Sequence, residues 1–139
     1  MNLILKIAQK AETKKIQDFF AKYLQKQNPW IVNEEFLCPF WVEGAVNRKQ
    51  VVILKFEEKV VGALRFYPRK RDNIVSVYQF ALKEKFRWKW LIKKMLQKTW
   101  FKHFESTCFV DSSFNDYYKK TGWKLEKSDE KFNYWRFKI

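Results

Sequence analysis

The sequence predicts an α/β (α+β) fold: one mixed, mostly antiparallel sheet of six to seven strands with helices on both faces. Three observations lead to this prediction. Short β-rich runs recur along the chain, two segments have apolar residues at the spacing of an amphipathic helix, and the middle of the chain runs strand, helix, strand. A helical crossover implies a central parallel pair of strands, and hairpins on either side imply antiparallel pairs.

The first third of the chain predicts one strand and two helices. Residues 3–8 form a short apolar run, and Thr13 can cap the helix that follows. Asn28-Pro29 ends that helix. Its apolar residues recur at i, i+3, i+4, i+7 and i+8: Ile16, Phe19, Phe20, Tyr23 and Leu24. Residues 30–49 are rich in aromatics and predict a loop and a short helix that cover a cleft.

The middle of the chain predicts a hairpin and a central strand. Residues 51–56 and 60–67 flank Glu57-Glu58-Lys59, a pattern typical of two strands and a turn. A basic turn follows at 68–72. Residues 74–82 are apolar on both faces, which indicates a strand buried on both sides.

The last third predicts two helices and three strands. A helix at 90–104 has an apolar arc and, opposite it, the lysines Lys93, Lys94, Lys98 and Lys102. Its apolar arc consists of Leu91, Ile92, Met95, Leu96 and Trp100. A strand at 106–110 follows, then a short helix over 114–120 that stops before Gly122. The segments 123–127 and 132–137 form a closing hairpin, and the whole chain, 1–139, makes a single domain.

Charge and composition limit the classes of partner. The 29 Lys and Arg residues outnumber the 15 Asp and Glu residues and give a net charge of +14, which favours polyanionic partners such as nucleic acid or phosphorylated ligands. A basic surface that only solvent contacts is the simpler interpretation. No apolar run approaches the roughly 20 residues of a membrane span, and Lys6 comes too early for a secretory signal, so we expect a cytoplasmic protein.

Cysteine and histidine content argues against several kinds of site. Cys38 and Cys108 lie among apolar residues and are expected to be buried free thiols. His103 is the single histidine, so neither a zinc site nor a Ser/His/Asp arrangement is indicated, and we expect no metal.

Three local patterns resemble the GNAT superfamily of acyl-CoA-dependent N-acetyltransferases. Lys59-Val60-Val61-Gly62 is similar to the entry of the family's third strand. Residues 80–87 are similar to its fourth strand running into a Tyr-Arg-Gly-x-Gly-x-Gly loop. Residues 111–123 are similar to its Asn-x-x-Ala-x-x-x-Tyr-x-x-x-Gly-Phe helix. Their order and spacing extend the resemblance over nearly the whole chain.

The resemblance implies an enzyme, an N-acyltransferase that moves an acyl group from acetyl-CoA or a related donor to an amine of an unknown acceptor. We expect a monomer or a homodimer. The resemblance further implies that the fourth strand separates from the fifth. By position, Tyr118 would protonate the leaving thiolate. The residues implied to bind the cofactor are Phe80, Ala81, Leu82, Arg87, Trp88, Lys89, Trp90, Leu91, Ile92 and Asp111.

The cofactor loop departs from the family pattern because its glycines are missing. Glycine lets backbone amides approach a pyrophosphate, yet Trp88, Trp90 and Ile92 stand at those positions. Three outcomes stay open. The loop binds CoA with the tryptophans turned outward, it holds another phosphorylated donor, or it binds no cofactor and presents its indoles to another ligand.

Two questions remain about further site residues. Carboxylates that are candidates for a general base are Glu34, Glu35, Glu43 and Glu84, although a solvated surface is the simpler interpretation of each. The alternative function is a GNAT-fold protein that binds or modifies DNA or RNA without ordinary acetyl-CoA use. Its candidate contacts are Arg69, Lys70, Arg71, Lys93, Lys94 and Lys98, with Trp88, Trp90 and Phe101 as rings for base stacking.

Overall fold

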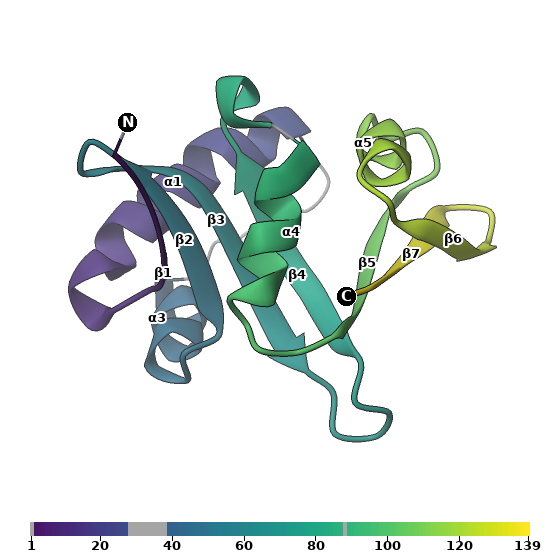
Figure 1. Ribbon diagram of the computed structural model, residues 1–139, viewed down its shortest axis with the longest axis horizontal. Coiled ribbons are helices and arrows are strands. Elements are labelled where there is room, and N and C mark those ends of the chain that lie inside the picture. The colour runs from purple at the N-terminus through teal and green to yellow at the C-terminus, as the bar shows by residue number, and fades with distance from the viewer. Residues whose placement is uncertain (1, 28–38, 88) are drawn as a thin grey trace.

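A computed structural model describes residues 2–27, 39–87 and 89–139. Seven strands form one sheet in the order β1-β2-β3-β4-β5-β7-β6 (Figure 1). The strands are β1 (Leu3–Ile7), β2 (Val51–Phe56), β3 (Lys59–Pro68), β4 (Val75–Leu82), β5 (His103–Phe109), β6 (Lys124–Ser128) and β7 (Phe132–Lys138). Only β4 and β5 are parallel; the other neighbouring pairs are antiparallel. The predicted fold class is confirmed.

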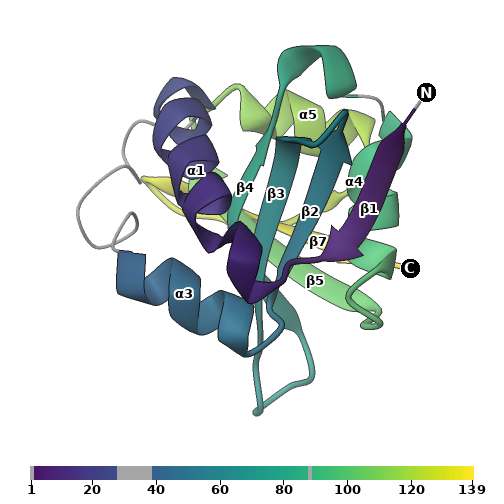
Figure 2. The same cartoon turned by 90° about the vertical axis from the view of Figure 1, so that its left-hand side faces the viewer.

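Helices cover both faces of the sheet, as its two-sided apolar strands require. The helices are α1 (Thr13–Gln27), α3 (Pro39–Asn47), α4 (Lys89–Gln97) and α5 (Phe114–Lys120). On one face, α1 and α3 pack their buried residues, such as Ile16 and Val46, against Ile53 and Ala63 (Figure 2). On the other face, α4 and α5 share a core with the sheet in which Met95 and Phe104 are fully buried.

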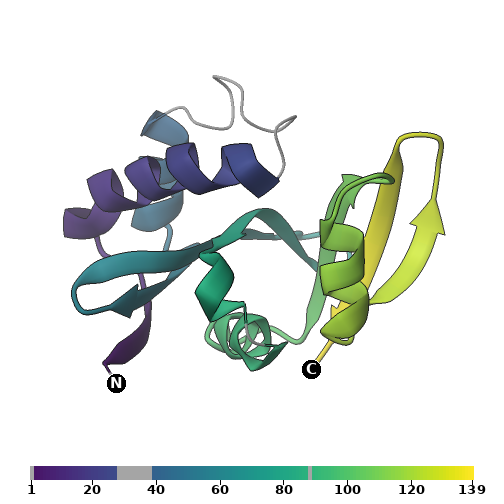
Figure 3. The ribbon, with the colours of Figure 1, turned by 90° about the horizontal axis from the view of Figure 1, so that it is seen from above.

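The sheet divides into two parts at the parallel pair. β4 and β5 are paired only from Val75↔Phe104 to Val77↔Ser106. Beyond that point β4 stays paired with β3 as far as Leu82, while β5 stays paired with β7. The two strands therefore diverge, and Figure 3 shows the two parts of the sheet from above. We call the region between residues 78–82 of β4 and 107–109 of β5 the splay; its formation confirms the expected strand separation.

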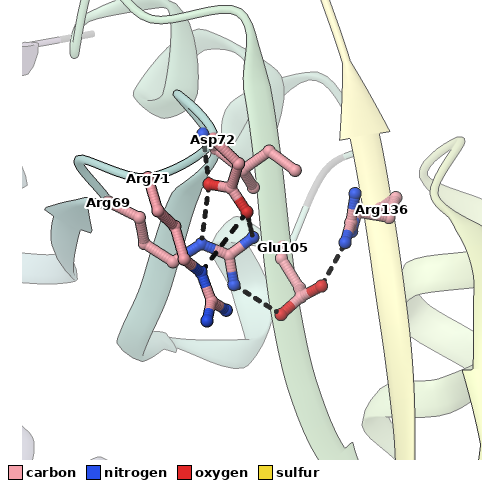
Figure 4. Close-up of polar contacts among 6 residues, drawn as sticks. Arg69, Arg71, Asp72, Glu105 and Arg136 are labelled. Atoms are coloured by element: carbon pink, nitrogen blue, oxygen red, sulfur yellow. Dashed lines mark hydrogen bonds and ion pairs between the residues drawn. The ribbon is translucent and has the colours of Figure 1, made fainter.

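Ion pairs hold the two strands together at the closed end of the splay. Arg69, just after β3, donates to Glu105 of β5 at 3.1 Å and to Asp72 at 3.2 Å (Figure 4). Arg136 of β7 donates to the other oxygen of Glu105 at 2.7 Å. Glu105 lies opposite Ser76 in the paired part of β4 and β5. The network thus links the β3–β4 hairpin to the second part of the sheet.

One predicted helix is too long. The helix expected over 90–104 ends at Gln97, and β5 begins at His103 rather than at Ser106. The Thr99 hydroxyl donates to the Leu96 carbonyl at 2.7 Å, and Trp100 has a φ of 69°, so the chain turns out of the helix here. Trp100, expected on the apolar arc, is 85% exposed.

The remaining boundaries agree with the predicted elements to within a few residues, and α3 is the short helix expected within 30–49. Residues 28–38 lie outside the described part of the chain. Among the described residues, no helix has the length and apolar content that a bilayer span requires.

Candidate functional site

The backbone of β4 forms one side of the splay. Phe80, Ala81 and Leu82 are buried, and each pairs with β3, whereas β5 offers no strand partner to this stretch. Gly62 lies opposite Leu82, and a Cβ at Gly62 would stand 2.6 Å from the Leu82 Cδ1. Glycine at this position therefore leaves room for the Leu82 side chain. Because β5 does not pair with residues 80–82, this side of β4 is a strand edge on which an extended, amide-bearing ligand can form hydrogen bonds.

Three aromatic rings, Phe80, Phe114 and Tyr117, form a cluster between β4 and α5. The Phe80 and Tyr117 rings are stacked, with centroids 6.0 Å apart and planes at 22°. Phe114 meets Tyr117 edge-on at 5.8 Å and Phe80 at 6.2 Å. We call these three residues the splay cluster. These phenyl and phenol rings line the region between β4 and α5.

Tyr117 carries a hydroxyl that is buried and has no hydrogen-bond partner among the described residues. Burial raises the pKa of this phenol above its ordinary value, and the nearby Arg87 guanidinium opposes that rise. A buried polar group without a partner is uncommon in folded proteins. The sequence pattern did not identify Tyr117, because the family motif places its tyrosine one residue later.

Tyr118, the residue at the motif position, lies at the closed end of the splay. Its side chain is 4% exposed and packs against Trp123 at 4.9 Å and Trp135 at 6.1 Å. Its hydroxyl is 2.6 Å from the Ser106 Oγ, and Ser106 is the last β5 residue paired with β4. Burial raises the pKa of Tyr118 despite the hydrogen bond to Ser106, so the phenol stays protonated over the ordinary pH range.

The loop after β4 places the guanidinium of Arg87 at the end of β4, where the splay begins to open to solvent. Arg87 donates from Nε to the Leu82 carbonyl at 3.1 Å, and its guanidinium lies 6.0 Å from the centre of the Phe114 ring. The exposed Arg87 side chain thus reaches from the end of β4 toward α5.

Two other residues that were expected to bind the cofactor, Leu91 and Ile92, have side chains in the core. Leu91 and Ile92 are 6% and 1% exposed and pack with the sheet, so only their backbone can contact a ligand. Ile92, at a glycine position of the family pattern, therefore directs its side chain into the core. Trp88 and the side chains of Lys89 and Trp90 lie outside the described residues.

Asn115, which the sequence analysis did not select, holds the turn between β5 and α5. Its amide donates to the carbonyls of Phe109 and Val110, and its oxygen accepts from the Trp135 indole at 2.9 Å. Asp111, expected to contact the cofactor, is exposed in this turn. These hydrogen bonds of the half-buried Asn115 fix the start of α5, and hence the positions of the two tyrosines.

The candidate general bases are not joined to the splay by any contact among the described residues. Glu84 is exposed in the short helix after β4, and Glu43 is half-buried in α3, with no hydrogen bond or ion pair to another described side chain. Glu34 and Glu35 lie outside the described residues. Across the described ranges, no group of three His, Cys, Asp or Glu side chains is arranged to hold a metal ion.

Cys108 is buried and free, as expected, and its thiol donates to the Asn115 oxygen at 3.1 Å. Burial raises the pKa of Cys108 to about 11. Cys38 lies outside the described residues.

The residues proposed for nucleic-acid contact differ in their surroundings. Arg69 is held by Asp72 and Glu105 and serves the fold, whereas Arg71 is 78% exposed and lies 3.7 Å from Asp72. Lys70, Lys93 and Lys94 are exposed and Lys98 is half-buried. The nucleic-acid alternative stays a prediction that these contacts do not test.

The sequence patterns also did not identify the buried charge of Arg65, which lies on the other face of the sheet. Arg65 of β3 is 5% exposed and donates to the Gln79 oxygen at 3.1 Å. The available signal was simple, since Arg65 is the one charged residue in the apolar run 60–67.

Comparison with solved structures identifies the fold. No protein-family model and no curated protein sequence matches the chain. The PaiA N-acetyltransferase of Thermoplasma acidophilum, solved with coenzyme A, superposes with a TM-score of 0.77 at 13% identity, over 100% of both chains.

Two further solved structures agree with this result. The polyamine N-acetyltransferase of Drosophila melanogaster gives a TM-score of 0.75 at 8% identity, over 99% of this chain and 100% of that one. The Salmonella typhimurium acetyltransferase that modifies the N-terminal serine of ribosomal protein L7/L12 gives a TM-score of 0.71 at 16% identity, over 100% of this chain and 96% of that one. The resemblance inferred from the motifs is confirmed at the level of structure: this chain has the fold of the GNAT N-acetyltransferases.

Proposed function

We propose that this protein is an N-acyltransferase that uses acetyl-CoA or a related acyl-CoA and acts in the cytoplasm. The observation that carries the proposal is the separation of β4 from β5 directly after Val77 and Ser106. An edge that has lost its neighbouring strand can bind the amides of a pantetheine arm as an added strand. The structural likeness to a coenzyme A complex supports the same assignment.

The residues of the splay fit the two ends of such a donor. The backbone of residues 80–82 would bind the pantetheine amides. Arg87, together with the amides at the start of α4, would attract the phosphates, since a helix N-terminus and a guanidinium both favour anions. Bound acyl-CoA would supply an acyl group activated as a thioester. The core positions of Leu91 and Ile92 limit their part to the backbone.

We propose Tyr118 as the acid that protonates the leaving thiolate. Its raised pKa keeps the proton on the phenol, and its hydrogen bond to Ser106 fixes the hydroxyl at the closed end of the splay. Tyr117 is the second candidate, because its hydroxyl has no partner in the described protein and its ring stacks on Phe80 of β4.

Calorimetric titration with acetyl-CoA tests the proposal, with ADP as a control for nonspecific attraction to a basic surface. We expect saturable binding of acetyl-CoA that is tighter than that of ADP. An absence of heat and of thermal stabilisation at millimolar acetyl-CoA, with salt-dependent binding of DNA or RNA, would contradict the proposal and favour the nucleic-acid alternative.

A further inference from the structure

The guanidinium of Arg65 is buried, and no carboxylate of the described residues forms an ion pair with it. Arg65 lies in the middle of β3, is 5% exposed, and donates to the amide oxygen of Gln79, which is 1% exposed. No ion pair joins Arg65 to an acidic side chain in the ranges that the structure describes. Burying an uncompensated charge is costly, and a guanidinium has five N–H donors to satisfy.

The surroundings of Arg65 are aromatic and positive. Its guanidinium lies over the rings of Trp41 and Tyr78, 5.6 and 5.5 Å from their centres. These rings are 46% and 47% exposed, so the cation lies beneath a partly open aromatic surface. Burial lowers the pKa of Arg65, and the charge of nearby Arg48 lowers it further. Cation–π contacts offset part of the burial cost, yet they supply no negative charge to pair with the guanidinium.

The position of Arg65 relates it to the splay. Arg65 pairs with Gln79 in the sheet, and Tyr78 directly follows Val77, the last β4 residue paired with β5. Arg65 contacts Trp41 of α3, on the face that α1 and α3 cover. Arg87 and α4 belong to the opposite face. The buried cation is therefore near the point where the strands part, on the face away from the proposed donor site.

We propose that Arg65 binds an oxyanion, a carboxylate or phosphate, of the amine that accepts the acyl group. This inference rests on the proposed function and specifies its substrate class. A guanidinium fork matches the oxygens of a carboxylate or phosphate, and the exposed parts of Trp41 and Tyr78 offer contact to an apolar portion of the acceptor. The cations around the site disfavour polyamines as acceptors, because like charges repel.

The test compares ligand pairs that differ in one anionic group, using thermal stabilisation of the full chain as the readout. The pairs are L-phenylalanine with L-phenylalaninamide, and phosphoethanolamine with ethanolamine; spermidine is the cationic comparison. We expect at least one ligand that carries the carboxylate or phosphate to raise the melting temperature more than its partner without that group, and spermidine to give no rise. A Kd measured for that ligand should weaken about tenfold or more in Arg65→Met.

Three controls make the result decisive. Arg48→Met removes a nearby exposed cation and should keep the anion effect, whereas loss of the effect in both variants would indicate nonspecific attraction. Arg65→Lys keeps the charge without the planar fork, and we expect it to bind the anion weakly even where Arg65→Met fails to fold. Equal stabilisation by both members of each pair, with and without the carboxylate or phosphate, overturns the inference.

Acetyl-CoA titration of the same variants separates this inference from the proposed function. Arg65→Met should bind acetyl-CoA as the wild type does, because the two sites lie on opposite faces. Failure of the wild type to bind acetyl-CoA would count against the acyltransferase proposal, whatever the anion result.

Discussion

Val77 and Ser106 form the last pair at which β4 and β5 run side by side. On one side of this pair, Glu105 accepts hydrogen bonds from Arg69 and Arg136, which link the two parts of the sheet. On the other side, the strands diverge and the splay cluster lies next to β4. Ser106 also hydrogen-bonds to Tyr118. The end of strand pairing and the proposed acid are thus fixed by the same residue.

The two adjacent tyrosines can be distinguished by kinetics. Once an amine acceptor has been identified, Tyr118→Phe should lower kcat by about 100-fold with little change in KM, because only the proton donor is lost. Tyr117→Phe should stay within about threefold of the wild type, as expected for a ring that only packs. Steady-state release of the CoA thiol measures both.

If Tyr117→Phe lowers kcat strongly and Tyr118→Phe does not, Tyr117 is the acid. Ser106→Ala is the matched control for the hydrogen bond, and we expect a loss of about tenfold or less. Since burial raises the pKa of both phenols, neither should produce a fall in kcat below about pH 10.

The ion-pair network at the closed end should contribute to stability. Glu105→Gln removes the charge that Arg69 and Arg136 share, at distances of 3.1 and 2.7 Å. We expect the free energy of unfolding to fall by about 1–3 kcal/mol, between the values for exposed and buried pairs. Urea denaturation monitored by tryptophan fluorescence measures it.

Glu58→Gln is the matched control, because Glu58 is 82% exposed and pairs with Lys55 at 3.6 Å. This substitution should change the free energy of unfolding by no more than about 0.5 kcal/mol. Equal stability of the two variants would mean that Glu105 does not hold the two parts of the sheet together.

Glu12 should make stability depend on pH. Burial alone would raise the pKa of its carboxyl, but the Gln9 backbone N–H and the ammonium groups of Lys6 and Lys55 outweigh burial and lower it. The folded protein therefore binds the proton less readily than the unfolded chain. The contribution of Glu12 is present above the unfolded pKa of about 4.3 and is lost as the pH falls through the lower folded value.

Comparison of wild type with Glu12→Gln measures that contribution. The difference in free energy of unfolding should be constant near neutral pH and should shrink below about pH 4. Asp18→Asn, at an exposed pair with Lys14, should show no comparable change. A difference that stays constant down to pH 2 would contradict the assignment.

Cys108 should react slowly with thiol reagents. With a pKa of about 11, it is about 0.1% thiolate at pH 8, against about a quarter for an ordinary cysteine. In a Cys38→Ser background, the rate with a disulfide reagent should be at least about 100-fold below that of the urea-unfolded protein. It should also rise steeply between pH 8 and pH 10; equal rates in folded and unfolded protein would show that Cys108 is accessible.

Local patterns predicted most of the fold because the relevant forces act over a few residues. The helix over 114–120 was predicted with its observed bounds, since Gly122 at a φ of 94° supplies the turn that ends it. The helix over 90–104 was extended too far because Trp100 fits the apolar arc on a wheel. The hydroxyl of Thr99 ends that helix earlier, and a hydrophobic pattern does not register such a bond.

The candidate site was only partly predictable, because its contacts join distant residues. Arg65 meets Gln79 through the β3–β4 register, which contains an irregularity directly after Arg65. Glu105 meets Arg136 across the β5–β7 pairing. The motif identified Tyr118, yet the burial of its hydroxyl and the unpartnered hydroxyl of Tyr117 depend on how α5 packs against both strands. These features require the three-dimensional arrangement.

The most direct measurement is hydrogen exchange of the full chain with and without saturating acetyl-CoA, read by mass spectrometry. If acyl-CoA binds along the free edge of β4, amides in peptides covering 78–82 should exchange more slowly with ligand, while those of the β2–β3 hairpin at 51–62 should be unchanged. Unaltered exchange at 78–82 under saturating ligand would contradict the account.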